Sequence, residues 1–173
     1  MRNLFFSLAL LCASVCGVNA ANGSEVNVLT NNAASVLAVS EQYVGTYAGT
    51  LYGIEMNGES GYEDQQMSFE ITEAGYLYGQ LAPIGEMPGT ITINMPVSVD
   101  TNGNLTTNAG SDVVATLKMS TFPYMTINLY LNENGLSNAS IENGELNFTL
   151  QVKGKFGVID MFPATINFTG VRQ

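Results

Sequence analysis

The sequence predicts an all-β domain folded as an antiparallel up-and-down barrel of eight strands. The first observation is an alternation of apolar and polar side chains in short runs, of which Thr90-Ile91-Thr92-Ile93-Asn94-Met95 is the clearest. Such a run gives a strand one dry face and one wet face. The second observation is that Asn-Gly dipeptides, which accept the positive φ of hairpin turns, separate several runs. Hairpins between successive strands imply a meander, and a meander with one apolar face buries that face by closing on itself.

The alternation predicts each strand in chain order. The expected strands are residues 44–54, 67–71, 76–82, 90–95, 112–121, 125–131, 146–152 and 166–169, with a short extra piece at 155–159. The expected turns are Asn57-Gly58, Asn102-Gly103, Asn134-Gly135 and Asn143-Gly144. No strong helical period interrupts this series, so one β domain accounts for the chain from residue 43 onward.

Three segments are expected along the chain. Residues 1–20 have the form of a signal peptide, in which Arg2 precedes an apolar run and Val18-Asn19-Ala20 suits a signal peptidase. Residues 21–42 are rich in Asn, Ala, Ser and Val without a sustained period, which predicts a flexible leader. Residues 43–173 form the barrel domain. The sequence therefore predicts an exported protein, whether periplasmic, at the cell surface or secreted, without a membrane span once the signal is removed.

Both cysteines, Cys12 and Cys16, lie in the predicted signal peptide. The exported domain would then have no thiol and no disulfide, and its stability would have to come from its core. Attachment of a lipid to one of these cysteines is the alternative. The preceding residues, Leu11 and Val15, are bulkier than those that usually precede a lipidated cysteine.

The two ends of the predicted domain resemble a known family. The start Tyr43-Val44-Gly45-Thr46-Tyr47-Ala48-Gly49-Thr50-Leu51 and the end Ile166-Asn167-Phe168-Thr169-Gly170-Val171-Arg172 resemble the lipocalin-like, or calycin-like, domains exported by gut Bacteroidetes. The resemblance implies an eight-stranded calycin barrel, in a family whose lipocalin relatives hold small apolar ligands inside the barrel.

In lipocalins the first strand carries Gly-x-Trp, and a late basic residue packs across that aromatic ring at the base of the barrel. Gly45, Tyr47 and Arg172 match this pattern, with Tyr in place of Trp. The resemblance therefore implies that Tyr47 closes the narrow end and that Arg172 stacks on it as a cation–π pair. A solvated, terminal Arg172 is the alternative.

The composition argues against several classes of activity. The chain has no His, and its 15 Asp+Glu against 5 Lys+Arg give a net charge of -10. A Ser or Thr nucleophile would therefore lack its usual base, and a nucleic-acid surface would lack cations. Neither a phosphate-binding loop nor a complete calcium loop is present. We therefore expect no enzyme, no cofactor, no metal and no nucleic-acid partner.

A cluster of carboxylates and one single carboxylate are the candidates for acid–base chemistry. Glu63, Asp64, Glu70 and Glu73 cluster in the sequence, but Glu70 alternates with apolar neighbours and so faces outward. Asp160 shares the parity of apolar residues, and its pKa would be raised inside a barrel. The nearby Pro163 favours a turn there instead.

The inward face is almost entirely aliphatic, aromatic or Met, which fits either a packed core or an apolar pocket. We predict a noncatalytic domain that binds a small apolar or amphipathic ligand in the barrel, with Tyr78, Met95, Met119 and Phe148 at its rim or lining. A filled barrel that serves as a structural or protein-interaction domain is the alternative. A third arrangement turns the apolar face outward into a membrane.

Overall fold

The computed structural model describes residues 39–85, 89–122, 124–156 and 159–173. The expected signal peptide at 1–20 and most of the expected leader at 21–42 lie outside the described residues. The strands are β1 Gly45–Met56, β2 Gln65–Ile71, β3 Tyr76–Leu81, β4 Gly89–Pro96, β5 Ser98–Val99, β6 Leu105–Thr106, β7 Val113–Met119, β8 Thr126–Glu142, β9 Glu145–Phe156 and β10 Ile159–Arg172.

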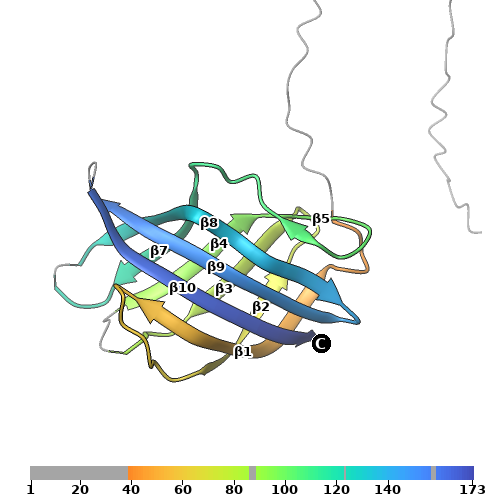
Figure 1. Cartoon of the computed structure of the whole chain (residues 1–173), viewed down its shortest axis with the longest axis horizontal. Helices are drawn as coiled ribbons and strands as arrows, with labels where there is room; N and C mark the ends of the chain where they lie inside the picture. The colour runs from red at the N-terminus through yellow and green to blue at the C-terminus, as the bar shows by residue number, and fades with distance from the viewer. Residues whose placement is uncertain (1–38, 86–88, 123, 157–158) are drawn as a thin grey trace, which may run out of the picture. The chain divides into compact units, whose positions relative to one another are not determined.

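Eight of these strands close into one antiparallel barrel, which confirms the predicted fold class. Around the barrel the order is β1-β2-β3-β4-β7-β8-β9-β10, and β10 pairs with β1 to close the ring. Each strand in this ring therefore pairs with its nearest barrel neighbours along the chain. In Figure 1, β8, β9 and β10 lie side by side across the barrel, with β1 next to β10. Closure leaves no unpaired edge in the ring.

The predicted alternation corresponds to the inner and outer faces of the barrel. Ile93, Leu129 and Phe148 are buried, whereas Asn94, Asn128 and Glu70 are exposed. The apolar face of the strands therefore lies inside, which is opposite to the outward-facing arrangement considered from the sequence.

Three phenylalanine rings fill the centre of the barrel. Phe69, Phe148 and Phe168 are at most 2 % exposed, and their ring centroids lie 4.8 to 5.4 Å apart. Phe69 meets the other two edge to face, the geometry that aromatic quadrupoles favour. Two inward glycines make room for them, since a Cβ at Gly79 would overlap the Phe69 ring and one at Gly170 would overlap Phe168.

Three of the four predicted Asn-Gly turns are confirmed. Asn57-Gly58 and Asn143-Gly144 have positive φ at both residues and join β1 to β2 and β8 to β9. Asn102-Gly103 lies in the turn between β5 and β6, where the carboxylate of Asp100 accepts hydrogen bonds from the backbone N–H groups of Asn102 and Asn104. A hydrogen bond from the Asn104 side chain, together with these backbone bonds, holds the pKa of Asp100 below its ordinary value.

The fourth predicted turn is wrong, because Asn134-Gly135 lies inside β8. There the side chain of Asn132 accepts hydrogen bonds from the backbone N–H groups of Asn134 and Gly135. This local bond and the positive φ of Gly135 produce a β-bulge that shifts the register between Leu131 and Leu136. The strand then continues to Glu142, well beyond the predicted end at residue 131.

Residues before the expected domain start at 43 also pack against the barrel. Val39, at the beginning of the described chain, is buried and belongs to the hydrophobic core. The backbone N–H of Tyr43 donates to the carbonyl oxygen of Ser40, so a turn leads into β1. The last residues of the expected leader are therefore part of the folded domain.

Candidate functional site

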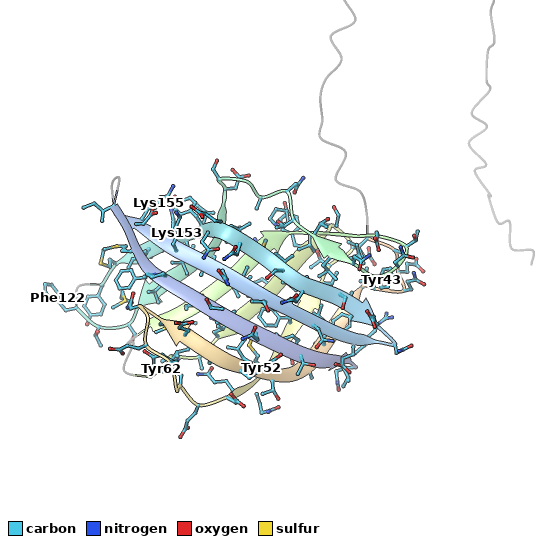
Figure 2. The ribbon with its side chains drawn as sticks, viewed as in Figure 1. Tyr43, Tyr52, Tyr62, Phe122, Lys153 and Lys155 are labelled. Carbon is cyan, nitrogen blue, oxygen red and sulfur yellow. The ribbon has the colours of Figure 1, made fainter. Side chains whose placement is uncertain are left out.

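The two ends of the barrel differ in their residues. We call the mouth the end formed by the β1–β2, β3–β4, β7–β8 and β9–β10 connections. We call the base the opposite end, where the β2–β3 and β8–β9 turns lie beside the segment preceding β1. In Figure 2, Phe122 marks the mouth and Tyr43 marks the base, at opposite ends of the barrel.

The interior contains small apolar cavities toward the mouth. Two cavities of about 20 Å³ each share Met56, Ile91 and Ala164 in their walls. The remaining walls of the deeper cavity are Leu81, Ile84, Ile93, Ala115, Leu150, Val152 and Ile166. A cavity of this size holds about one water molecule, whereas pockets for small ligands span about 300 to 1,000 Å³. The resting barrel is therefore nearly filled.

The cavity nearer the mouth is bordered by Phe162 and Pro163. Phe162 has φ +51°, a left-handed backbone conformation that is strained for a bulky side chain. It lies within a register shift between Met161 and Ala164, and the facing strand β1 is shifted between Tyr52 and Glu55. Two β-bulges thus meet at this part of the mouth and bring Phe162 over the apolar interior.

The four predicted ligand-binding residues do not come together. Tyr78 is 43 % exposed on the outer wall, between the buried Leu77 and Gly79, so the expectation that it lines the interior or its rim is wrong. Met95 is fully buried and pairs with Leu77 near the base, whereas the half-buried Met119 pairs with Gly89 near the mouth. Phe148 belongs to the central aromatic cluster. None of the four lines the two apolar cavities.

Sequence reasoning missed Phe162, Ala164 and Met56, which do line the cavities. For Met56 the available signal was a break in parity, because Leu51 and Ile54 are both apolar although they are three residues apart, and the structure buries both. A strict alternation cannot bury both, so a bulge had to lie between them. Gly53, with φ +54°, occupies that bulge.

The three base residues do lie together. Tyr47 is fully buried and pairs with Arg172 across β1 and β10, and its hydroxyl donates to the carbonyl oxygen of Tyr43 at 2.8 Å. Burial raises the pKa of Tyr47, and the positive charge of Arg172 partly opposes this. Gly45 has φ +141°, and a Cβ there would lie 3.0 Å from Nε of Arg172. The absence of a side chain at Gly45 thus makes room for the guanidinium.

Arg172 holds the segment before β1 rather than stacking on an aromatic ring. Its guanidinium donates to the carbonyl oxygens of Gln42 at 2.8 Å and Glu41 at 3.3 Å. Among the described residues, the cation–π pair found is Lys155 over the Tyr130 ring instead. The expected stacking of Arg172 on Tyr47 is therefore replaced by carbonyl hydrogen bonds. Arg172 is exposed, as the alternative of a solvated residue expected, but its guanidinium is held by these bonds.

We expect Arg172→Gln to lower the free energy of unfolding by about 1 to 2 kcal/mol, because two charge-assisted hydrogen bonds are lost. Arg172→Lys is expected to recover only part of this, since an ammonium lacks the planar fork that reaches both carbonyls. Urea unfolding followed by circular dichroism measures both variants. Wild-type stability in Arg172→Gln would show that these bonds contribute nothing to the fold.

Polar hollows lie outside the apolar interior. One of about 430 Å³ is lined by Tyr62, Glu63 and Asp64 together with residues 83–85 after β3, and both carboxylates are exposed. Another, of about 320 Å³, contains Lys153, whose Nζ donates to Oδ2 of Asp160 at 2.7 Å. That bond holds the pKa of Asp160 below its ordinary value. Asp160 is exposed, so the raised pKa considered for an interior position does not arise.

Comparison with models of protein families, with curated proteins and with solved structures finds no significant match. Within the described residues, no group of three or more His, Cys, Asp and Glu side chains could hold a metal ion. No helix of the described chain is long and apolar enough to cross a membrane. The fold is compatible with ligand binding, and the mouth is where apolar interior and solvent meet.

Proposed function

We propose that this protein is an exported, noncatalytic, lipocalin-like barrel that binds the apolar part of a small amphipathic molecule through its mouth. The observation that carries the proposal is the pair of apolar cavities bordered by a strained Phe162. Removal of the Phe162 ring would open the outer cavity and leave an apolar recess lined by Met56, Ile91 and Ala164. Burial of a ligand's hydrocarbon there would supply its affinity.

The backbone strain at Phe162 gives a physical basis for a movement of its ring away from the outer cavity. A non-glycine residue with φ > 0 costs about 1 to 2 kcal/mol relative to its ordinary backbone conformation. A rearrangement that returns Phe162 to that conformation recovers this energy, which offsets part of the cost of exposing its ring. The apparent affinity of a ligand rises as the open state becomes more populated.

The experiment compares ligand binding in three variants of the full chain. Anilinonaphthalene sulfonate, an amphipathic fluorescent probe, is titrated into each. Phe162→Gly removes the ring and the strain, and we expect it to raise the probe affinity about fivefold or more, which corresponds to about 1 kcal/mol. Ala164→Leu fills both cavities, and we expect it to lower the affinity at least about tenfold. Tyr52→Ala, on the outer wall, is the control and should leave the affinity unchanged.

Organic extraction of the purified protein followed by mass spectrometry tests for a molecule carried from the producing cell. A bound amphipathic compound that is present in the wild type and absent in Ala164→Leu supports the proposal. Equal probe affinities in Phe162→Gly and Ala164→Leu, with nothing extracted, would contradict it.

The second candidate is a filled barrel that acts as a structural or interaction domain. The central cluster of Phe69, Phe148 and Phe168 favours it, because these rings occupy the space that a deep ligand would need. The two candidates differ in the extraction experiment, since a filled barrel carries no molecule.

A further inference from the structure

One side of the mouth exposes several large apolar side chains. Phe122 is 86 % exposed and Tyr124 is 78 % exposed, both in the β7–β8 connection, and Met125 follows them. Ile159, at the start of β10, is 63 % exposed. We call these four residues the apolar tip. Elsewhere on the described barrel, Tyr76 and Tyr78 share the outer face of β3, at 37 % and 43 % exposure, and Tyr52 and Val171 lie on β1 and β10.

All three lysines of the chain lie on the strands next to the apolar tip. Lys118 is in β7, one residue before the strand ends, and Lys153 and Lys155 are in β9 near the mouth. Figure 2 shows Lys153, Lys155 and Phe122 toward the same end of the molecule. Lys153 is paired with Asp160, and the Lys155 ammonium lies 5.0 Å from the centre of the Tyr130 ring. Lys155 also lies opposite Asp160 in the β9–β10 pairing, so one carboxylate stands against two lysines, and Lys118 belongs to no ion pair of the described residues.

Asp160, which is exposed next to Ile159, is a carboxylate on this side of the mouth, and three further acidic residues lie on the other side. Glu59, Glu63 and Asp64 are exposed in the β1–β2 connection. In the ring of eight strands, the β1–β2 pair lies opposite the β7–β8 pair. A chain with a net charge of -10 thus concentrates its three lysines on the side of its most exposed aromatic residues, with Asp160 among them and away from the carboxylates of the β1–β2 connection.

We propose that this protein docks on the surface of an anionic lipid bilayer through the apolar tip, with Lys118 and Lys155 against the lipid headgroups. Protruding Phe and Ile side chains with adjacent lysines match the two layers of a bilayer surface, the hydrocarbon boundary and the charged headgroups. Tyr124 suits the boundary between them, because its ring is apolar and its hydroxyl is polar. The carboxylates of the β1–β2 connection would then face away from the bilayer.

The absence of tryptophan from the chain provides a clean test. In the full chain, Phe122→Trp places a single fluorescent reporter at the apolar tip. On titration with vesicles of phosphatidylcholine and phosphatidylglycerol, we expect a blue shift of its emission, and binding at least about tenfold weaker to vesicles of phosphatidylcholine alone. Tyr52→Trp, at a 41 % exposed position on the outer wall away from the apolar tip, is the control and should show no shift.

The lysines are tested in the Phe122→Trp background. Lys118→Gln and Lys155→Gln are each expected to lower the partition coefficient about fivefold, because each lysine near an anionic surface adds its own electrostatic attraction to the binding free energy. Lys153→Gln should have a smaller effect, since its charge is already paired with Asp160. Circular dichroism of every variant checks that the barrel is folded.

Three results would overturn the proposal. The first is a folded Phe122→Trp protein whose emission does not change with anionic vesicles. The second is an equal shift in Tyr52→Trp. The third is a blue shift of the emission that increases with protein concentration in the absence of lipid, accompanied by dimers in analytical ultracentrifugation. That result would make the apolar tip an interface between copies of the chain. Docking is separable from ligand uptake, because Ala164→Leu should still bind vesicles.

Discussion

Replacement of Gly49 by alanine is expected to lower the free energy of unfolding by at least about 3 kcal/mol. Gly49 pairs with Gly170 where β1 and β10 close the barrel. A Cβ at Gly49 would overlap the carbonyl oxygen of Thr169 and the Cα of Gly170. These are backbone atoms of the neighbouring strand, so no rotamer change can relieve the overlap, and the two strands would have to separate. Chemical denaturation followed by circular dichroism measures the loss.

Gly58→Ala is the matched control for this prediction. Gly58 has φ +80° in the β1–β2 turn, but a Cβ there would meet nothing within 4 Å. Its replacement therefore adds backbone strain without a steric overlap, at about 1 to 2 kcal/mol. A Gly49→Ala protein as stable as Gly58→Ala would mean that the β1–β10 seam adjusts at little cost. The close approach of the two strands would then not be essential for closing the barrel.

Phe148→Ala is expected to destabilise the protein by about 3 to 5 kcal/mol, because it leaves a cavity in the central aromatic cluster. Phe148 is 2 % exposed and its ring centroid lies 5.0 Å from that of Phe69 and 5.4 Å from that of Phe168. Phe122→Ala makes the same chemical change at an exposed loop position and should change stability by no more than about 0.5 kcal/mol. Thermal and denaturant unfolding of the two variants give the comparison.

The same variant separates a core role for Phe148 from a ligand-binding role. Phe148 does not line either apolar cavity near the mouth. At temperatures where Phe148→Ala remains folded, its affinity for the amphipathic probe should therefore equal that of the wild type. A large loss of probe affinity with little loss of stability would instead place the ligand deep in the barrel, as the sequence analysis expected.

The alternation of side chains was sufficient to predict the barrel because its period is a local property of the backbone. Runs such as 90–95 determine their own inner and outer faces, and burial of one face requires a partner sheet or closure. The Asn-Gly turns were readable for the same reason at Asn57 and Asn143. At Asn134 the prediction failed. The same dipeptide can close a hairpin between two strands or form a β-bulge within one strand, and here β8 continues past it.

The candidate site was harder to predict because bulges interrupt the alternation there. Phe162 and Ala164 lie beside a register shift in β10, and Met56 follows a shift in β1. Once the period is interrupted, parity counted from the sequence assigns no face to the residues beyond it. For Tyr78 the period is not interrupted. It lies on a regular strand, and the alternation of that strand already placed it on the outer wall rather than at the ligand site.

The sequence by itself determined the class of fold, the order of the strands and the apolar character of the interior, since each follows from patterns among residues that are close together in the chain. Only the tertiary structure decided how the interior space is divided, with three rings at the centre and small cavities toward the mouth. It also decided that Arg172 binds backbone carbonyl oxygens of the segment before β1 and that the lysines lie on strands next to the apolar tip. These outcomes depend on contacts between residues far apart in the chain, which closure of the barrel alone brings together.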